Sequence, residues 1–451
     1  MMYDVIVIGG GPAGLAAATA ARAQGAESIL VLEREAHMGG ILNQCIHDGF
    51  GLVRYHAALT GPEYAARAEA EARSAGVEIL SDTMVLAITP EREVTAVNRN
   101  GLHRWQARAL VLATGCRERT RGAVSIPGSR PAGIFTAGVV QNLVNTKNIM
   151  IGKRVVILGS GDIGLIMARR LTLEGARILA VLELLPDSAG LQRNISQCLQ
   201  DFQIPLYTGH TVTKIIGGKK LTAVEVSAVD AQGAPVSGSE RIVECDALVL
   251  SVGLIPENEV AGAAGVALDA RSNGTVTDEF LQTSLPGVFS CGNSHGVMDL
   301  VDFVSEQGEI AGHNAAAFSQ GQPLTPWNPT DRVPPAKGVP KEGSVICPLC
   351  PNGCCLHVGL DGTVTGNRCP RGKAYAQQEQ REPMRILTTT VRGPSGCLLP
   401  VKTDRPIPRA MILQASSQLR TLKITAHVVH CGDALLKDIC GANIIATRAC
   451  K

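Results

Sequence analysis

Two stretches of the chain share a pattern in which a β-branched apolar run leads into a glycine-rich turn and a helix of small residues. In the first, residues 5–8 form the apolar run, residues 9–14 the turn, and the small residues continue to Ala21. A second apolar run, residues 28–32, follows and ends at Glu33. Short apolar runs bounded by glycine are typical of buried parallel strands. The pattern therefore predicts a strand, turn, helix and strand, which is the start of a βαβ unit.

The turn has the spacing G-x-G-x-x-G, formed by Gly9, Gly11 and Gly14. In such a turn the first glycine permits the bend, the second lets the backbone approach a pyrophosphate, and the third lets the helix pack closely on the strand. Free N–H groups and the positive end of the helix dipole then favour phosphate binding. Glu33 stands nineteen residues after Gly14, where a carboxylate can accept the ribose hydroxyls of an adenosine half. An ordinary buried turn is the alternative, but this context favours a dinucleotide site.

The second stretch repeats the first with a constant offset of 150 residues. Its turn and closing carboxylate are Gly159, Gly161, Gly164 and Glu183. Four positions in register predict a second dinucleotide-binding domain. A carboxylate after the second strand repels a 2′-phosphate, and residues 184–187 supply no basic side chain. The second site is therefore expected to prefer NADH to NADPH.

Composition excludes several classes of function. The 451 residues are 45% hydrophobic and 18% charged, and their formal net charge is +2. This balance gives no basic surface for nucleic acid, and we expect no nucleic-acid partner. No apolar run is long enough to predict a membrane span, so a cytoplasmic protein is expected, with peripheral membrane association only through a partner. Prolines crowd residues 321–344, which predicts a linker or an extended wrapping segment rather than a packed element.

Residues 1–320 resemble the thioredoxin-reductase-like, pyridine nucleotide-disulfide oxidoreductase type of flavoprotein. The residues that carry the resemblance are the two turns with Glu33 and Glu183, Ala113-Thr114-Gly115, Ser251-Val252-Gly253 and Gly287–Asn293. Independently of the resemblance, a helix is expected over residues 300–318. The resemblance implies an α/β fold with two Rossmann-like domains. An FAD-binding domain would be split over residues 1–120 and 286–320, around an inserted NAD(P)H-binding domain at residues 121–285.

By the same resemblance, each domain has its own set of cofactor-binding candidates. For FAD they are Gly9, Gly11, Pro12, Ala13, Gly14, Glu33, Gly40, Ala113, Thr114, Gly115, Gly292 and Asn293; for the nicotinamide nucleotide they are Gly159, Gly161, Asp162, Ile163, Gly164, Glu183 and Gly253. Asn293 departs from the family, which usually has Asp there. It keeps a hydrogen-bond acceptor and loses a charge.

The flavin-proximal region lacks the cysteine pair that a disulfide reductase needs. Cys45 stands alone two residues before His47, and no CxxC precedes the second turn. Cys45 is thus a weak catalytic candidate, either a reactive thiol beside His47 or a small buried residue. Residues 113–122 and 130–134 resemble the NAD/FAD-dependent subunits that accompany glycerol-3-phosphate dehydrogenases, opine oxidases and related dehydrogenases. That resemblance implies a second flavoprotein as partner.

Nine of the fourteen cysteines lie at or after Cys347, and in a reducing compartment such clustering indicates metal ligation rather than disulfides. The candidate ligands are Cys347, Cys350, Cys354 and Cys369. Three cysteines in one tight loop and a distant fourth followed by proline favour a [4Fe–4S] cluster, with structural zinc as the alternative. Cys355 is an alternative third ligand. Cys397, Cys431, Cys440 and Cys450 form no recognisable ligand spacing, and we expect them to be scattered structural residues.

Residues 345–451 form an expected small α+β, cysteine-rich module, and they resemble a domain of unknown function encoded beside those flavoproteins. The sequence thus predicts an FAD-dependent oxidoreductase subunit that relays electrons between NADH, FAD, the cluster and a partner dehydrogenase of glycerol-3-phosphate or 2-hydroxyacid type. Two alternatives stay open. One is a stand-alone NADH-dependent reductase of a thiol, quinone or dioxygen with a zinc-stapled tail. The other is a non-catalytic redox-sensing or assembly partner.

Overall fold

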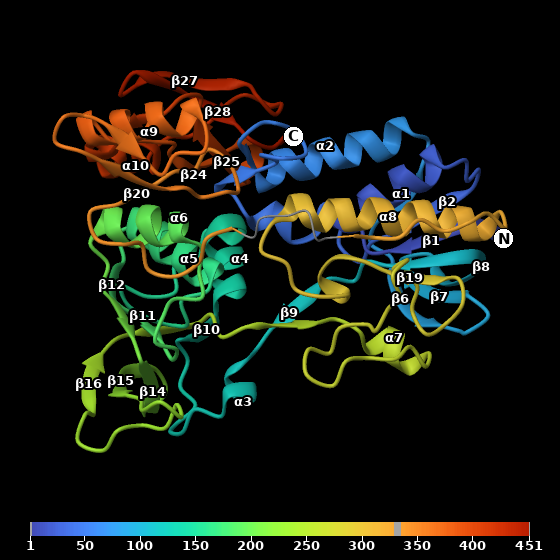
Figure 1. Ribbon diagram of the computed structural model, residues 1–451, viewed down its shortest axis with the longest axis horizontal. Helices are drawn as coiled ribbons and strands as arrows, with labels where there is room; N and C mark the ends of the chain where they lie inside the picture. The colour runs from blue at the N-terminus through green and yellow to red at the C-terminus, as the bar shows by residue number, and fades with distance from the viewer. Residues whose placement is uncertain (1, 329–334, 451) are drawn as a thin grey trace. The chain divides into compact units, whose positions relative to one another are not determined.

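The computed structural model describes residues 2–328 and 335–450, and the chain divides into two compact units (Figure 1). The first unit comprises Met1–Cys45, Gly49–Arg117 and Leu254–Arg332; the second comprises Ile46–Asp48, Glu118–Gly253 and Val333–Lys451. Residues 329–334 of the proline-rich segment, and the two terminal residues, lie outside the described residues. Within the described part of the chain, no helix is long and apolar enough to cross a membrane.

The first unit is built on a seven-stranded sheet in the order β5-β2-β1-β8-β7-β6, with β19 paired to β8. Its strands are β1 (Met2–Ile8), β2 (Ile29–Leu32), β5 (Glu78–Leu80), β6 (Met84–Ile88), β7 (Glu93–Asn98), β8 (Gly101–Leu112) and β19 (Val288–Ser290). The pairs among β5, β2, β1, β8 and β19 are parallel, whereas β6, β7 and β8 pair antiparallel. Because β1 and β2 are covered on both faces, they consist of continuous apolar runs, as the sequence predicted.

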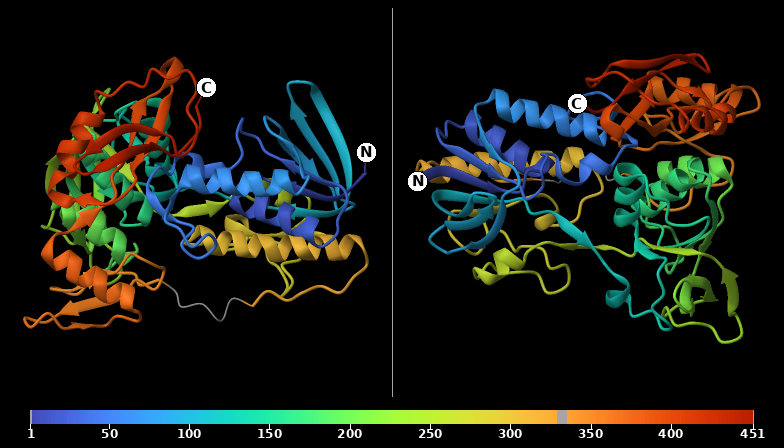
Figure 2. Two further views of the ribbon diagram at one scale, coloured as in Figure 1. Left: turned by 90° about the horizontal axis from the view of Figure 1, so that it is seen from above. Right: turned by 180° about the vertical axis from the view of Figure 1, so that it is seen from behind.

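Two helices of the first unit, α1 (Pro12–Ala23) and α8 (Val301–Ser319), lie side by side (Figures 1 and 2). Glycines permit this close approach, since a Cβ on Gly308 or Gly312 would overlap the backbone of α1. The predicted helix over residues 300–318 is confirmed as α8. The remaining elements are η1 (Gly40–Gln44), β3 (Asp48–Phe50), β4 (Leu59–Thr60), α2 (Gly61–Ser74), β9 (Cys116–Glu118), β18 (Leu254–Pro256), α7 (Glu259–Ala263) and η4 (Gly292–Ser294).

The second unit repeats the parallel arrangement in a five-stranded sheet of order β10-β17-β11-β12-β13. Its strands are β10 (Ile134–Thr136), β11 (Arg154–Leu158), β12 (Arg177–Glu183), β13 (Leu206–Thr208) and β17 (Ala247–Leu250). A three-stranded antiparallel sheet follows, made of β14 (His210–Gly217), β15 (Leu221–Ala228) and β16 (Arg241–Glu244). The helical segments are α3 (Arg121–Val124), α4 (Ala137–Lys147), α5 (Asp162–Leu173), α6 (Gln192–Asn194), the π-helical turn η2 (Ile195–Leu199) and η3 (Gln200–Phe202).

The C-terminal module belongs to the same second unit and combines helices with antiparallel strands. Its main sheet has the order β24-β25-β28-β27, from β24 (Thr388–Arg392), β25 (Leu398–Thr403), β27 (Ala434–Ile439) and β28 (Ala442–Ala446). Further elements are β20 (Val345–Ile346), β21 (Cys355–Val358), β22 (Val364–Thr365), α9 (Pro370–Arg381), β23 (Met384–Arg385), η6 (Pro394–Gly396), β26 (Ile407–Pro408), η7 (Arg409–Met411) and α10 (Ile412–Leu419). The predicted α/β fold with two Rossmann-like domains and a small C-terminal module is therefore confirmed.

A buried ion-pair network fastens this module within the second unit. The guanidinium of Arg385 in β23 donates to Asp201 of η3 at 2.6 Å and to Glu379 of α9 at 2.5 Å. Arg385 and Asp201 are 7% and 4% exposed, so both charges depend on this pairing. Leu173, the last residue of α5, also packs into the apolar core of the module. The module thus shares its core with the helix that follows the second glycine-rich turn.

Candidate functional site

The first glycine-rich turn joins β1 to α1 and leaves room for a ligand at one position only. A Cβ on Gly9 or Gly14 would overlap the backbone carbonyl oxygens of Ala113 and Gly9, respectively, whereas a Cβ on Gly11 would meet nothing within 4 Å. Gly11 is the N-cap of α1, and no side chain caps that helix. The first N–H groups of α1 therefore face open space, which fits a pyrophosphate.

Glu33 closes this site at the end of β2. It is only 6% exposed. Its Oε2 accepts a hydrogen bond from the Gly10 N–H at 2.8 Å, and its Oε1 accepts one from the Glu35 N–H at 2.8 Å. Both bonds come from backbone, so the carboxylate is held in place and retains acceptor capacity for a ribose.

Other predicted FAD residues gather around the same turn. Gly40 has a φ of +53°, and a Cβ there would stand 3.3 Å from the Cα of Gly11. A Cβ on Gly292 would stand 2.8 Å from Ala13. The hydroxyl of Thr114 is buried and has no hydrogen-bond partner in the described structure. An orphaned buried hydroxyl beside an open phosphate cradle fits a bound dinucleotide.

Asn293, the departure from the family pattern, is engaged within the first unit. Its Oδ1 accepts a hydrogen bond from the Met298 N–H at 3.1 Å, and its Nδ2 donates to the Cys116 sulfur at 3.4 Å. The amide therefore orders the segment between η4 and α8. An aspartate could accept the first bond but could not donate the second.

The sequence did not point to Gln307 and His295, which organise the same corner. The side-chain oxygen of Gln307 accepts from the Gly292 N–H at 2.7 Å, and its nitrogen lies 3.0 Å from Nδ1 of His295. Burial lowers the pKa of His295, so its ring is neutral at neutral pH. The sequence signal that could have directed attention to this part of α8 is the G-x-x-x-G spacing of Gly308 and Gly312, because these two glycines lie on the face of α8 that approaches α1.

The second glycine-rich turn joins β11 to α5. Its third glycine contacts the side chain of a serine, whereas the third glycine of the first turn contacts backbone. A Cβ on Gly159 would overlap the carbonyl oxygen of Ser251. The Ser251 hydroxyl also accepts from the Gly164 N–H at 3.1 Å. Asp162 opens α5, and its Oδ1 accepts from the Leu191 N–H and the Asn194 side chain, both at 2.8 Å. The loop after β12 is thereby tied to the turn.

The remaining candidates of the second site differ in their surroundings. Ile163 packs against the apolar core beneath α5. Gly253 has a φ of +109°, which glycine adopts without strain. Glu183 is 6% exposed, and its two oxygens accept hydrogen bonds from Ser160 and from the Leu185 N–H. The second turn thus presents a fixed carboxylate, as the first does.

Comparison with known proteins decides the family. The pattern that defines the family described as pyridine nucleotide-disulphide oxidoreductase matches residues 3–308, about two thirds of the chain. The chain belongs to this family. It is accordingly an oxidoreductase, and FAD and a pyridine nucleotide are the expected cofactors of such a flavoprotein. A second pattern, described as a protein of unknown function (DUF1667), matches residues 370–448.

Two curated relatives are similar to this chain in sequence, and one solved structure is similar to it in fold. Thioredoxin reductase of Listeria innocua is 28% identical over 327 residues, which cover 70% of this chain and 94% of that protein. An opine oxidase subunit of Agrobacterium tumefaciens is 27% identical over 337 residues, which cover 70% of this chain and 64% of that protein. The crystal structure of T. acidophilum thioredoxin reductase matches with a TM-score of 0.58 and 23% identity, covering 71% of this chain and 99% of that one.

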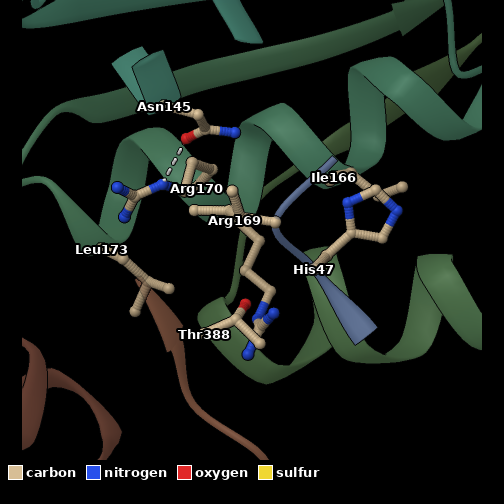
Figure 3. A pocket seen from close by; sticks show the side chains of 8 residues that line it. His47, Asn145, Ile166, Arg169, Arg170, Leu173 and Thr388 are labelled. Carbon is tan, nitrogen blue, oxygen red and sulfur yellow. Dashed lines mark hydrogen bonds between the residues drawn. The ribbon is translucent and has the colours of Figure 1, made fainter. Parts of the chain in front are cut away.

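Cys45 and His47, which are two residues apart in the sequence, fall in different compact units. Cys45 lies at the end of the first segment of the first unit, half-buried, whereas His47 belongs to the second unit. There His47 lines a small cavity of about 10 Å³ beside Asn145 and Arg169 (Figure 3). Burial, and then the positive charges of Arg193 and Arg169, lower the pKa of His47 to about 3. A neutral imidazole supplies no positive charge to stabilise a Cys45 thiolate, and a catalytic role for Cys45 stays a prediction.

The four predicted metal ligands lie in one neighbourhood of the second unit. Cys347, Cys350 and Cys354 belong to the loop between β20 and β21, and Cys369 directly precedes α9. Burial raises the pKa of Cys347, and the thiols of Cys350, Cys354 and Cys369 act on it in the same direction. Cys369 is the N-cap of α9, and hydrogen bonds from the backbone of Gly372 and then Arg371 lower its pKa. In the described residues, however, no three His, Cys, Asp or Glu side chains are already gathered around a common metal position. The donor set itself, four thiols with N–H donors, suits an iron–sulfur cluster or zinc.

Cys354 and Cys355, the two candidates for the third position, differ in their surroundings. Cys354 and the buried Leu356 belong to the small core that contains Cys347. Side chains alternate along a strand, so Cys355 at the start of β21 points to the opposite face.

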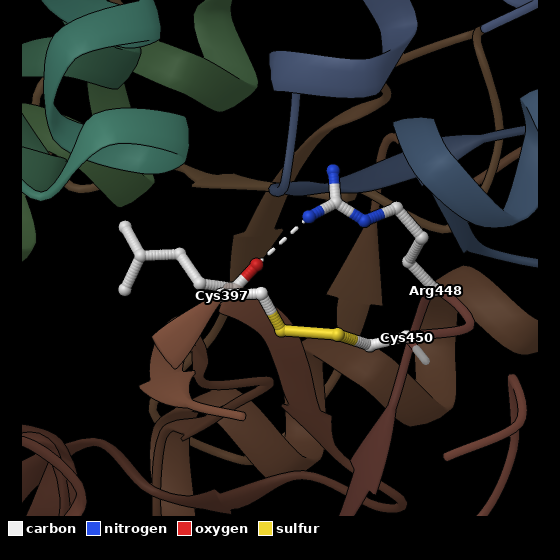
Figure 4. Close-up of a disulfide and its surroundings, with 4 residues drawn as sticks. Cys397, Arg448 and Cys450 are labelled. Carbon is white, nitrogen blue, oxygen red and sulfur yellow. Dashed lines mark hydrogen bonds between the residues drawn. A yellow bond between two sulfur atoms is a disulfide. The ribbon is translucent and has the colours of Figure 1, made fainter. Parts of the chain in front are cut away.

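The expectation that the late cysteines are not joined by disulfides is wrong for one pair. Cys397 and Cys450 form a disulfide beside Arg448, whose guanidinium donates to the Leu398 carbonyl oxygen at 2.8 Å (Figure 4). The two cysteines are 53 residues apart, and the pairing of the C-terminal residues with Val429 and β25 brings them together. The spacing of the cysteines along the sequence does not predict the strand pairing that brings Cys397 and Cys450 together.

Proposed function

We propose that this chain is the NADH-linked subunit of a two-protein oxidoreductase. Its first unit would hold FAD, its second unit NADH, and Cys347, Cys350, Cys354 and Cys369 a [4Fe–4S] cluster. Its partner would be a second flavoprotein that dehydrogenates glycerol 3-phosphate or a 2-hydroxyacid. FAD, when bound, exchanges two electrons with a nicotinamide and one at a time with a cluster. Electrons can run in either direction, because oxidation of the organic substrate can also reduce NAD⁺.

The observation that carries the proposal is the pair of nucleotide turns, each closed by a buried carboxylate, in a chain without a CxxC motif before the second turn. The carboxylate at the second turn supports NADH, because it repels the 2′-phosphate of NADPH and residues 184–187 offer no cation. The missing cysteine pair argues against disulfide reduction. The likeness to an opine oxidase subunit supports a partner protein.

Hydride transfer depends on orientation more than on acid–base groups, so the protein's task is to hold the two nucleotides. In the first unit the open N-terminus of α1, Glu33 and the buried Thr114 hydroxyl would fix the dinucleotide. In the second unit Glu183 would receive the adenosine ribose, and Gly161 would admit the pyrophosphate. No catalytic acid or base is required by this chemistry.

Rapid mixing of the full-length, FAD-loaded protein with NADH or NADPH under anaerobic conditions tests the core of the proposal. NADH should bleach the flavin absorbance within seconds or faster, and NADPH at equal concentration should do so at least about tenfold more slowly, the equivalent of about 1.4 kcal/mol. Equal rates would contradict the nucleotide preference. Bleaching by neither nucleotide would favour the non-catalytic redox-sensing alternative.

Metal analysis of anaerobically purified protein tests the cluster. We expect iron and acid-labile sulfide, with an EPR signal after reduction. C354S should lose the iron, whereas C355S, which changes the adjacent thiol, should retain it and serves as the matched control. Zinc without iron would contradict the relay and favour a stand-alone reductase with a structural zinc site.

A further inference from the structure

The two nucleotide turns differ at one buried position. The residue between the first two glycines is Gly10 in the first turn and Ser160 in the second. In both turns its N–H donates to the closing carboxylate, at 2.8 Å to Glu33 and 3.0 Å to Glu183. The second turn adds a bond that the first lacks, because the Ser160 hydroxyl also donates to Oε2 of Glu183, at 2.5 Å.

The extra bond changes what the carboxylate can offer a ligand. An ionised carboxylate has about four acceptor positions. The protein fills two of them on Glu33, through Gly10 and Glu35, and three of them on Glu183, through the two Ser160 donors and Leu185. A ribose presents two hydroxyls. Glu33 can therefore accept both of them, whereas Glu183 has a position for one.

The Ser160 hydroxyl cannot turn away from Glu183, because both of its own acceptor positions are taken. The Ser188 hydroxyl donates to it at 2.9 Å and the Ala189 N–H at 3.1 Å. Ser188 in turn accepts from the Gly190 N–H at 3.2 Å. Ser160 is fully buried and Ser188 is 5% exposed, so water does not compete for these bonds.

We infer that Ser160 weakens the hold of the second nucleotide site on the adenosine ribose, by occupying an acceptor position on Glu183 that the corresponding carboxylate of the first site keeps open. The consequence suits the chemistry of the two ligands. A cofactor that stays bound is held more tightly when the carboxylate accepts both ribose hydroxyls. A nucleotide that binds and dissociates in every turnover is released more readily when one of these hydrogen bonds is absent. The inference rests on the proposed function, in which the second site takes NADH.

Calorimetric titration of the oxidised, FAD-loaded, full-length protein with NAD⁺ tests the inference without turnover. S160A frees the acceptor position and should lower the Kd for NAD⁺ about three- to tenfold, the worth of one hydrogen bond. S188A is the matched control, because Ser188 belongs to the same chain of hydroxyls and does not touch Glu183. Its Kd should stay within about twofold of wild type. FAD content and melting temperature of each variant check the fold.

A second measurement needs no variant. Because Glu183 accepts one ribose hydroxyl in the wild type, NAD⁺ analogues that lack either the 2′- or the 3′-hydroxyl of the adenosine ribose should bind within about twofold of NAD⁺. In S160A each deletion should cost about three- to tenfold.

Each other outcome overturns the inference. If S160A and S188A both weaken NAD⁺ binding, the serines support the loop and do not limit the ribose contact. If S160A leaves the Kd for NAD⁺ unchanged, the acceptor position that Ser160 occupies does not limit NAD⁺ binding. The same conclusion follows if either deoxy analogue binds much more weakly than NAD⁺ to the wild-type protein. If the wild-type protein binds no NAD⁺ at all, the proposed function fails, and the inference with it.

Discussion

The two nucleotide turns share their glycine spacing and their closing carboxylate, yet the surrounding contacts differ. At the first turn Gly9 and Gly14 each approach a backbone carbonyl oxygen, and the N-terminus of α1 is open at Gly11. At the second turn side chains take part, since Ser251 contacts the third glycine and Asp162 ties down the loop after β12. The motif therefore fixes where a phosphate lies, while the side chains around it decide how firmly and how reversibly the nucleotide is held.

The helices that follow the turns differ in the same way. Helix α1 packs against α8 of its own unit through Gly308 and Gly312. Helix α5 is covered instead by the C-terminal module, where the buried Arg170 donates to the hydroxyls of Thr389 and Thr390 at 3.2 and 3.3 Å. Added side-chain volume should therefore destabilise the close α1–α8 pair, whereas loss of a hydrogen-bond partner should destabilise the contact between α5 and the C-terminal module.

The largest expected effect comes from the third glycine of the first turn, and the third glycine of the second turn is its comparison. A Cβ on Gly14 would overlap the carbonyl oxygen of Gly9, which cannot move without breaking the turn, so G14A should cost about 3 kcal/mol of unfolding free energy and most of the FAD. A Cβ on Gly164 would stand 3.0 Å from the Gly159 oxygen and 2.8 Å from Cβ of Ser251. G164A should therefore cost only about 1 kcal/mol. Urea titration and flavin absorbance measure both, and equal losses would contradict the difference between the turns.

The next largest effect concerns the C-terminal module of the second unit. R385M removes the buried guanidinium that pairs with both Asp201 and Glu379, leaves Asp201 only its bond to the exposed Arg409, and should cost about 3 kcal/mol. R409M is the control, since Arg409 is 44% exposed and its bond to Asp201 at 3.0 Å should contribute less than about 1 kcal/mol. Chemical denaturation compares the two variants. A similar loss in both would show that burial is not what makes the network strong.

Replacing Glu33 and Glu183 in turn should affect different cofactors, with a tenfold change expected in the Kd for NAD⁺. E33Q should reduce the FAD retained after purification and leave NAD⁺ affinity intact, whereas E183Q should raise the Kd for NAD⁺ about tenfold and leave FAD bound. Flavin absorbance and calorimetry give the two readings. If E33Q weakened NAD⁺ binding while FAD stayed in place, the assignment of the two turns would be reversed.

The smallest effect is a pH dependence that belongs to the second unit. The pKa of His47 is lowered to about 3, from 6.5, so below pH 6.5 the unfolded chain binds a proton that the folded chain excludes. Stability should therefore fall as the pH falls, by about 0.7 kcal/mol between pH values of about 7 and about 6. Replacing His47 by Asn should remove this part of the slope in urea titrations at the two pH values. An unchanged slope would mean that His47 becomes protonated in the folded protein.

Much of this molecule followed from local patterns in the sequence. The β-branched runs, the glycine spacing and the closing carboxylates identified both βαβ units, because a strand, a tight turn and a helix each impose a short-range rule on residue type. The constant offset of 150 residues identified Glu183 as the counterpart of Glu33 from the sequence alone. The helix α8 and the α/β fold followed for the same reason.

Contacts between segments that are distant in the sequence could not be predicted from these short-range rules. Asp201 meets Arg385 across 184 residues, Gly292 donates to Gln307 on another element, and Cys397 joins Cys450 across 53 residues. His47 is two residues from Cys45 in sequence and belongs to the other compact unit. Periodicity and spacing report only which residues share a face or a turn. The partner of a buried charge, amide or thiol is set by the path of the whole chain. The tertiary structure alone therefore decided that the Ser188 hydroxyl donates to Ser160, whose own hydroxyl donates to Glu183.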